Sequence, residues 1–511
     1  MHAPATAAAA APDSTTDRSF FGHPRGLATL FFTEMWERFS YYGMRAILML
    51  FMTAAVVNGG LGFDAATAGP IYGLYTSMVY VVALPGGWFA DRVIGQRHAV
   101  LVGGIVIMLG HISLAMQGLP YFLLGLFLVI CGTGLLKPNI STMVGQLYSA
   151  EDARRDSGFS LFYMGINLGG FLAPLACGFL AQHPRFQALL VSWGMDPARS
   201  WHWGFGAAAV GMFFGIIQYV LGARHLRGAG IAPGDPLAPS RRKLAKVVLA
   251  VLILGGAAIL LSSGNSAIAA MPTVNKTMAV VLLVTPLAFF TWLLTVGSRD
   301  RDERKRHLVI FVLFLGASVF WSAFEQAGST LTLFAKESTR HSFLGITFPA
   351  SWFQSVNSLW IIVLAPVFAW IWLRLGRREP STPTKFALGL FFLAAGFAIL
   401  IPAARFSAGG GAVSAGWLIT TYLLHTIGEL CLSPVGLSAM TKLAPMRYAG
   451  LMLGVWFLAA SVGNFIGGNV AGLYDAFTTD QIFTAVTVFV LAACALMLLF
   501  VRPIKRMLAR D

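Results

Sequence analysis

The sequence predicts an all-α, polytopic membrane protein, and three observations support this fold class. Of its 511 residues, 57% are hydrophobic. Only 11% are charged, whereas soluble domains carry about one quarter. The apolar residues also gather into long blocks, and a block of about 20 residues crosses a hydrocarbon layer of ~30 Å as a helix. These observations exclude an ordinary soluble globular protein.

Fourteen apolar blocks are expected to be transmembrane helices. Their ranges are 27–55, 68–90, 98–117, 120–147, 157–182, 203–222, 243–262, 277–297, 307–334, 352–373, 386–404, 415–441, 449–474 and 481–501. An even number of spans places both termini on one face, which we expect to be cytoplasmic. The segment before the first block is rich in Ala, Pro, Ser and Thr and lacks the pattern of a signal peptide.

The net charge of +15 follows from membrane orientation rather than from nucleic-acid binding. Lys and Arg concentrate in cytoplasmic loops of membrane proteins. With both termini inside, the outer face receives only Arg185, Arg199, Lys276, Lys336, Arg340 and Arg405. Four more lie within spans: Arg38, Arg45, Lys137 and Lys246. The other basic residues fall on the inner face, so no nucleic-acid partner is expected.

The chain is expected to divide into two bundles joined by a helical insert. Blocks 243–262 and 277–297 contain no acidic residue and are predicted to face lipid. Removing them leaves six spans on either side, an arrangement in which transporters place a binding site between two bundles. The predicted segments are a disordered cytoplasmic tail (1–26), an N-terminal six-helix bundle (27–222), a linker with two extra transmembrane helices (223–305), a C-terminal six-helix bundle (306–502) and a cytoplasmic tail (503–511).

No cofactor or metal site is indicated. The four cysteines lie in apolar blocks without CxxC spacing or histidine partners, so inert buried thiols are the simplest interpretation. The glycine-rich stretch Gly132 to Lys137 lacks the spacing of a nucleotide-binding loop and is followed by a proline. Without a nucleotide site, transport would have to use an ion gradient or run downhill.

Ionisable residues within the first span are the strongest functional signal. A charge at the centre of a membrane helix costs at least ~2.5 kcal/mol and persists only with a partner, a water-filled cavity or a role. At about 100° per residue, Glu34, Arg38, Tyr41 and Arg45 fall within a sector of about 60°, flanked by Glu37 and Tyr42. A fixed salt bridge that only packs helices is the alternative interpretation.

Three more ionisable residues lie in mid-span beside glycine or proline. Lys137 in the fourth span is expected to face an aqueous cavity, because neighbouring glycines and Pro138 weaken the helix there. Glu325 and Glu429 are carboxylates whose protonation would remove a desolvation cost, which suits proton carriage. Each of them could instead simply bond to a neighbouring helix.

Several motifs resemble, in order along the chain, those of the proton-coupled oligopeptide transporter family of the major facilitator superfamily. They are Glu34-x-x-Glu37-Arg38-Phe39-x-Tyr41-Tyr42, Gly87-x-x-x-Asp91-Arg92, Gly134-Leu-Leu-Lys137-Pro138-Asn139, Phe162-Tyr163-x-x-Ile166-Asn167-x-Gly169, Phe324-Glu325-Gln326, Gln354-Ser-x-Asn357 and Gly428-Glu429-x-x-x-Ser433-Pro434-x-Gly436. The match spans about residues 27 to 502, and the two-helix insert resembles bacterial members with fourteen helices. His425 departs from the residue expected in this family.

The resemblance implies a major facilitator fold, and import of di- and tripeptides with protons by alternating access, in a bacterial inner membrane. It implies a peptide site lined by Tyr41, Tyr42, Arg45, Tyr80, Lys137, Asn167, Trp321, Asn357, Glu429 and Trp456. Arg45 and Lys137 would hold the peptide carboxylate, and Glu429 with Asn357 the amino group. Ordinary packing is the alternative for the aromatic residues.

The resemblance also implies how protons and gates are handled. Proton coupling would fall to Glu34, Glu37, Arg38, Lys137 and Glu325. Arg45 and Glu325 would pair across the bundles when the outer gate shuts. Asp91 and Arg92 would form a gating loop on the inner face, where Asp91 would cap a helix of the other bundle.

The expected partners are di- and tripeptides, protons and the lipid bilayer, with no obligate protein partner. Two other functions remain open from the sequence. One is a proton-coupled symporter for a non-peptide organic anion, which dipeptide competition would distinguish. The other is a membrane sensor or enzyme, although no catalytic set or extramembrane domain supports it.

Overall fold

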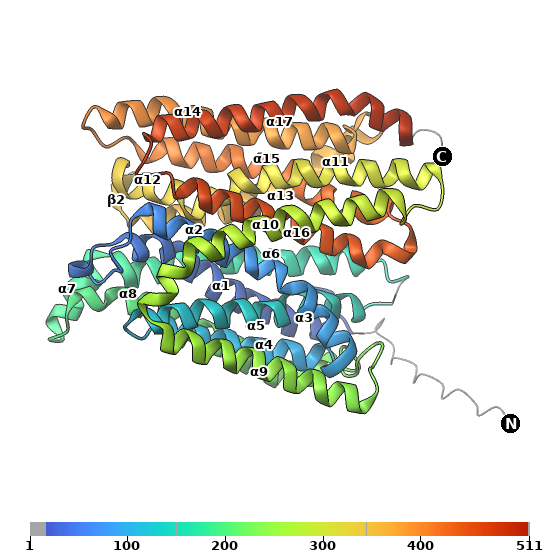
Figure 1. Cartoon of the computed structure of the whole chain (residues 1–511), viewed down its shortest axis with the longest axis horizontal. Helices are drawn as coiled ribbons and strands as arrows, with labels where there is room; N and C mark the ends of the chain where they lie inside the picture. The colour runs from blue at the N-terminus through green and yellow to red at the C-terminus, as the bar shows by residue number, and fades with distance from the viewer. Residues whose placement is uncertain (1–16, 150, 344, 509–511) are drawn as a thin grey trace.

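The structure, a computed structural model, describes residues 17–149, 151–343 and 345–508, and it is almost entirely helical (Figure 1). The first half contains α1 (Arg25–Thr53), α2 (Ala65–Val81), α3 (Ala83–Phe89), α4 (Gln96–Leu114), α5 (Leu119–Gln146), α6 (Arg155–Gln182), α7 (Pro184–Ser192) and α8 (Ser200–Gly222). The insert contains α9 (Pro239–Ser263) and α10 (Asn265–Thr295). The second half contains α11 (Arg301–Phe324), α12 (Thr330–Ser338), α13 (Gln354–Leu375), α14 (Thr382–Ala408), α15 (Ala415–Leu443), α16 (Ala449–Ala471) and α17 (Thr479–Leu508). Strands β1 (Ser342–Phe343) and β2 (Ile346–Thr347) form a small antiparallel hairpin.

Within the described residues, thirteen helical segments are long and apolar enough to cross a membrane. Helix α1 is not among them, because its ionisable residues exceed what such a span ordinarily carries. It is nevertheless 29 residues long and packs mainly on α6 and α8. The structure is therefore that of a multi-pass helical membrane protein, and the full set of fourteen spans stays a prediction.

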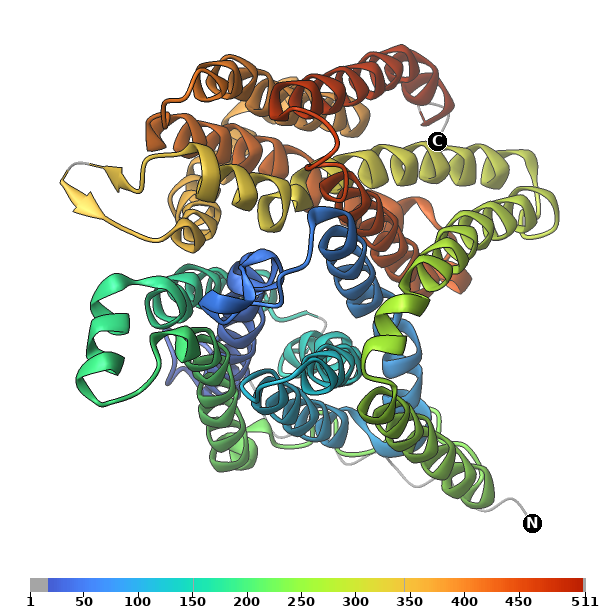
Figure 2. The same cartoon turned by 60° about the vertical axis from the view of Figure 1, so that its left-hand side comes forward.

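The two halves lie side by side, and the insert runs along their flank (Figures 1 and 2). The first half occupies the lower part of Figure 1 and the second half the upper part. The described chain begins and ends at the same end of the molecule, on the right of Figure 1. We call the opposite end, where α1 ends at Thr53 and α2 begins at Ala65, the distal end.

Close contacts between the halves gather toward the distal end. Helices α2 and α16 cross where Gly73 faces Gly468, so closely that a Cβ atom added to Gly468 would lie 2.2 Å from the Gly73 Cα. Further along the same crossing, the hydroxyl oxygens of Ser77 and Ser461 are 2.7 Å apart. On the other side, Trp352 before α13 donates from Nε1 to the Leu175 carbonyl on α6 at 3.1 Å. Small residues and hydrogen bonds are typical of interfaces between membrane helices, because the hydrophobic effect contributes little to helix association within lipid.

Local sequence signals explain where key helices begin and where one is interrupted. The Asp64 carboxylate accepts a hydrogen bond from the Thr67 N–H and caps α2. Asp300 caps α11 by accepting from the N–H groups of Asp302 and Glu303. Helix α11 ends at Phe324, and one 3₁₀ turn over Glu325–Gly328 precedes α12. The predicted span 307–334 is thus broken at Glu325, and this irregular backbone is enclosed by protein.

The insert bridges the two halves while remaining largely exposed. No residue of α9 is buried, and in α10 only Leu282, Pro286, Phe290 and Leu293 are. Helix α9 rests on α5 of the first half. Helix α10 rests on α11 of the second half, where the ring centroids of Phe290 and Phe311 are 4.9 Å apart. This exposure fits the prediction that the insert faces lipid.

Several details differ from the sequence expectations. The disordered tail was expected over 1–26, and residues 1–16 lie outside the described residues. Residues 17–26 are instead held in place: the Asp17 carboxylate accepts from the Arg25 N–H at 3.0 Å, and His23 Nδ1 lies 2.9 Å from the Tyr148 hydroxyl. The tail expected from residue 503 is helical to Leu508, because α17 continues past Pro503, and 509–511 lie outside the described residues. Helix α7 and the β1–β2 hairpin were not predicted, since both are shorter than a span.

The glycine crossing makes a stability prediction. Gly468→Val should lower the free energy of unfolding by about 1–3 kcal/mol, because its side chain would collide with the Gly73 backbone. Thermal unfolding of the purified protein measures the loss. Gly255→Val is the matched control, since a Cβ atom at that position of α9 meets nothing within 4 Å. Equal destabilisation by both changes would contradict the role of the crossing.

Candidate functional site

The first part of the site is an ion cluster on α1. The Arg38 Nε lies 3.2 Å from the Glu34 Oε1 and also pairs with the Glu37 carboxylate. All three side chains are buried, and Glu37 is fully so. Glu34 Oε2 and Glu37 Oε1 have no hydrogen-bond partner among the described residues. Two carboxylates thus share one guanidinium in an apolar setting, and a proton on either carboxylate would remove the excess negative charge.

Aromatic rings enclose the same guanidinium. The Arg38 Cζ lies 5.1 Å from the centroid of the Tyr41 ring and 5.9 Å from that of Tyr42. Such faces attract a cation, and the attraction strengthens when the pair is removed from water. The spacing on α1 that the sequence indicated therefore produces a compact set of contacts rather than isolated groups.

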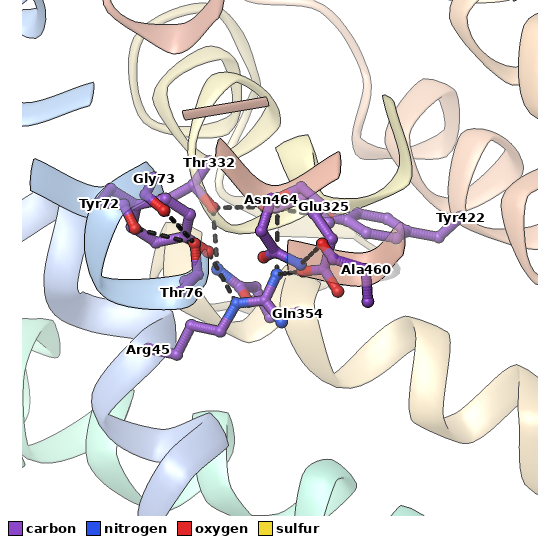
Figure 3. A network of polar contacts seen from close by, with 11 residues as sticks. Arg45, Tyr72, Gly73, Thr76, Glu325, Thr332, Gln354, Tyr422, Ala460 and Asn464 are labelled. Atoms are coloured by element: carbon purple, nitrogen blue, oxygen red, sulfur yellow. Dashed lines mark hydrogen bonds and ion pairs between the residues drawn. The ribbon is translucent and has the colours of Figure 1, made fainter. Parts of the chain in front are cut away.

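The second part is an ion pair that joins the two halves. Arg45 on α1 pairs through one terminal nitrogen with the carboxylate of Glu325, at the break between α11 and α12. Its Nε donates to the Tyr72 hydroxyl on α2 at 2.7 Å. Figure 3 shows Arg45 lying between these two partners. Both charged side chains are less than one tenth exposed, so the pair is shielded from water and only weakly screened.

The broken helix that carries Glu325 is held by side chains from the second half (Figure 3). The Thr332 hydroxyl donates to the Ala327 carbonyl at 2.8 Å and accepts from Gln354 Nε2 at 3.0 Å. The Tyr422 hydroxyl also donates to the Ala327 carbonyl, at 3.4 Å. These bonds replace part of the backbone pairing that an unbroken helix would supply, so the position of Glu325 depends on three helices.

Lys137 on α5 is the third charged element. Its ammonium lies 4.1 Å from the centroid of the Tyr80 ring on α2 and 5.9 Å from that of Phe457 on α16. It forms no ion pair with the described residues, and its side chain is partly exposed. A partly exposed cation on aromatic faces can receive an anionic group without first releasing another carboxylate.

The second half contributes a carboxylate held by an amide. The Asn357 Nδ2 on α13 donates to Glu429 Oε2 on α15 at 3.1 Å and to the Thr426 hydroxyl at 3.0 Å. The rings of Trp321 and Trp456 meet edge to face, with centroids 6.5 Å apart. His425 lies one turn from Glu429, and the centroid of its ring is 4.9 Å from that of the Phe397 ring. Neither ring nitrogen of His425 has a hydrogen-bond partner among the described residues.

The remaining predicted residues lie apart from these contacts. Asn167 donates from Nδ2 to the Tyr163 carbonyl of its own helix at 3.0 Å. The Asp91 carboxylate, in the π-helical turn Ala90–Ile94, accepts from Gln96 at 3.0 Å. Arg92 pairs with Asp235 at 2.9 Å. Asp91 was expected to cap a helix of the second half. Among the described contacts, its carboxylate bonds within the first half instead. The capping role therefore stays a prediction.

Two contributors were missed by the sequence analysis. Tyr72 binds Arg45, and Phe457 lies beside Lys137. Both are aromatic residues within apolar blocks, where packing is the ordinary expectation. Only the tertiary approach of α2 to α1 and of α16 to α5 distinguishes them, and no spacing in the sequence carries that information.

Comparison with known proteins identifies the family. Residues 97–489 match the model of the POT family. The chain belongs to this family. It is 40% identical over 512 residues to a peptide transporter of Yersinia enterocolitica, covering 96% of each chain. It is 37% identical over 502 residues to a di-/tripeptide transporter of Lactococcus lactis subsp. cremoris, covering 96% of this chain and 98% of that one.

A solved structure shares the fold. The crystal structure of a POT peptide transporter in complex with sulfate superposes with a TM-score of 0.86 at 40% identity, covering 97% of this chain and 98% of that one. The predicted fold class and family are thereby confirmed, and the protein is a membrane transporter rather than an enzyme. The open alternative of a membrane enzyme is removed.

A double-mutant cycle can measure how much the ion pair between the halves contributes to the free energy of unfolding. Glu325→Ala should lower the free energy of unfolding by about 3–5 kcal/mol, because Arg45 would remain buried without its partner. The double variant Arg45→Ala/Glu325→Ala should recover part of that loss. Chemical denaturation in detergent of the parent, of Glu325→Ala, of Arg45→Ala and of the double variant completes the cycle.

Tyr72→Phe provides the control, because it removes a neutral acceptor from Arg45 and leaves the charge pair. Its effect should be smaller than that of Glu325→Ala. A Glu325→Ala variant as stable as the parent protein would show that the pair does not hold the halves together.

Proposed function

We propose that this protein imports di- and tripeptides together with protons by alternating access, driven by the inward proton gradient across a bacterial inner membrane. The observation that carries the proposal is the Arg45–Glu325 pair, a buried ionic connection between the two halves. The peptide transporters of Yersinia and Lactococcus described above support the substrate class. Partners of the protein are then peptides, protons and lipid, with neither nucleic acid nor an obligate protein partner.

The distribution of charge supports a site for zwitterionic peptides. Such a peptide has a carboxylate at one end, an ammonium at the other and variable side chains between. Lys137 in the first half offers a cation without an ion-pair partner among the described residues. Glu429, oriented by Asn357 in the second half, offers an anion. A bound peptide would therefore draw the halves together through its two ends.

Binding of the ends alone would leave side-chain selectivity low. The partly exposed rings of Tyr42, Tyr80 and Trp321 supply apolar walls with polar tips. Trp456 packs on Trp321 and is nearly buried, so it supports the wall more than it lines it. This division favours recognition of the peptide termini and tolerance of what lies between.

We infer the route of proton coupling from the ionic contacts that a bound proton would weaken. A proton on Glu325 would neutralise the partner of Arg45 and release the two halves. A proton on Glu34 or Glu37 would leave Arg38 paired with one carboxylate and relieve the excess charge on α1. We assign the first event to the opening of the distal end and the second to the energetic coupling of substrate and proton.

Uptake into proteoliposomes tests the proposed function. Labelled dialanine should accumulate when an inward proton gradient and a negative internal potential are imposed, and unlabelled tripeptide should block it. Nitrate and other non-peptide anions serve as competitors, because an anion symporter is the second candidate. Failure of a folded preparation to move dialanine, together with competition by an anion, would replace the peptide proposal.

Lys137→Ala should abolish gradient-driven dipeptide uptake. The change removes the cation assigned to the peptide carboxylate and leaves Tyr80 and Phe457 without their charged neighbour. The measurement is the initial rate of dialanine uptake at equal protein density. Lys246→Ala, which removes a lysine from α9 of the insert, is the control and should transport normally. Unimpaired uptake by Lys137→Ala would move the essential cation elsewhere.

Glu325→Gln should separate coupling from binding. The amide can still accept a hydrogen bond from Arg45 but cannot be protonated and released in the same cycle. We therefore expect exchange of internal for external dipeptide to persist while gradient-driven accumulation is lost. Counterflow and accumulation, measured on the same vesicles, distinguish the two. Accumulation at the parent level would exclude Glu325 from proton coupling.

A further inference from the structure

A groove on the outside of the first half lies apart from the substrate site. It has a volume of about 740 Å³ and lies between α1, α8 and the α6–α7 turn. One stripe of α8 and its N-cap forms its floor: Arg199, His202, Trp203, Gly206, Val210 and Phe214. These positions recur at three- and four-residue intervals, so they face one side of the helix. From Arg199 to Phe214 the stripe runs about 22 Å along the axis at 1.5 Å per residue.

The deep end of the groove is apolar. It is bounded by Trp36 and Phe39 on α1, and the ring centroids of Trp36 and Phe214 are 5.5 Å apart. Both α1 side chains are partly exposed. They immediately flank the buried ion cluster, since Glu37 and Arg38 lie between them in sequence. An occupant of the deep end would therefore touch the outer surface of the helix that carries the cluster.

The other end of the groove is polar, and the exposed tryptophans beside it indicate the depth of a membrane interface. Arg199 and Gln117 line it, both exposed, and Arg199 forms no ion pair with the described residues. Trp193 and Trp203 beside it are 55% and 41% exposed, with ring centroids 6.4 Å apart. Exposed tryptophans gather where the hydrocarbon meets the headgroups. Arg199 is also among the few basic residues that the sequence places on the outer face.

We propose that this groove binds an anionic phospholipid of the outer leaflet, with an acyl chain along the α8 stripe and the phosphate on Arg199. The shape and polarity match such a molecule: a long apolar channel that runs with the helix, closed at its interfacial end by an arginine suited to phosphate. A soluble anion would use only the polar end and leave unexplained the apolar length from Trp203 to Phe214, about 16 Å at 1.5 Å per residue.

Gly206 offers a way to close the groove without damaging the fold. A Cβ atom added there meets a single neighbour within 4 Å, the Cβ of Ala115 at 4.0 Å, which is ordinary contact. By contrast, a Cβ on Gly211, which also lines the groove, would lie 2.5 Å from the Phe39 ring. Gly206→Leu therefore fills the channel from its floor, whereas a change at Gly211 would disturb the packing of α1.

The test measures lipid binding to the intact protein in detergent by native mass spectrometry. The probes are phosphatidylglycerol, phosphatidylcholine with the same acyl chains, and glycerol 3-phosphate. The parent protein should bind phosphatidylglycerol in preference to phosphatidylcholine. Arg199→Gln should weaken phosphatidylglycerol binding about fivefold, as expected for one basic side chain at the headgroup level, and leave phosphatidylcholine unchanged. Gly206→Leu should weaken the binding of both lipids.

Arg185→Gln is the matched control, since it removes a positive charge from α7 outside the groove. It should bind both lipids as the parent does. Dialanine uptake and thermal unfolding show whether Gly206→Leu remains folded. The proposal is overturned if Arg199→Gln and Arg185→Gln lose phosphatidylglycerol equally, if a folded Gly206→Leu binds lipid like the parent, or if glycerol 3-phosphate displaces the lipid completely.

Discussion

The architecture depends on the contact between Arg45 and Glu325. It joins a helix of the first half to the interrupted helix of the second half, near the distal end where α2 and α16 cross through glycines. A buried ion pair contributes little net stability compared with a well-packed apolar contact, yet breaking it is costly because one charge would be left unpaired. This asymmetry suits the proposed gate, in which the closed state would be held until a proton changed the charge of one partner.

The interruption between α11 and α12 is a consequence of the same constraint. A regular helix would project the side chain of residue 325 from a continuous rod whose backbone bonds are satisfied. The 3₁₀ turn instead brings Glu325 against Arg45 and leaves carbonyls such as that of Ala327 for Thr332 and Tyr422. The local cost of a broken helix is thereby offset by side chains from α12 and α15, and the carboxylate is held from several directions.

The ionic groups are divided between the halves in a way that suits the proposed coupling of peptide and proton. Arg38 with its two glutamates and Lys137 belong to the first half, whereas Glu429 with Asn357 belongs to the second. The insert contacts both halves: α9 rests on α5 of the first half, and α10 contacts α11 and α16 of the second half as well as α2 of the first. The turn that joins α9 to α10 contains Gly264, whose φ of +48° favours glycine.

The sequence by itself determined the membrane class, the position of nearly every long helix and the residues of the α1 stripe. Hydrophobic length and the rarity of charges in mid-span are local properties, and they do not depend on how helices pack. The pairing of Arg45 with Glu325 was expected only from the family resemblance, and the structure forms it. Only the tertiary structure decided that Tyr72 and Phe457 join the site. These are contacts between segments far apart in the chain, and their geometry depends on helix crossings and on the conformation of the two halves. It also decided that the tail from Asp17 is anchored, since its partners Tyr148 and Arg154 lie more than 100 residues away.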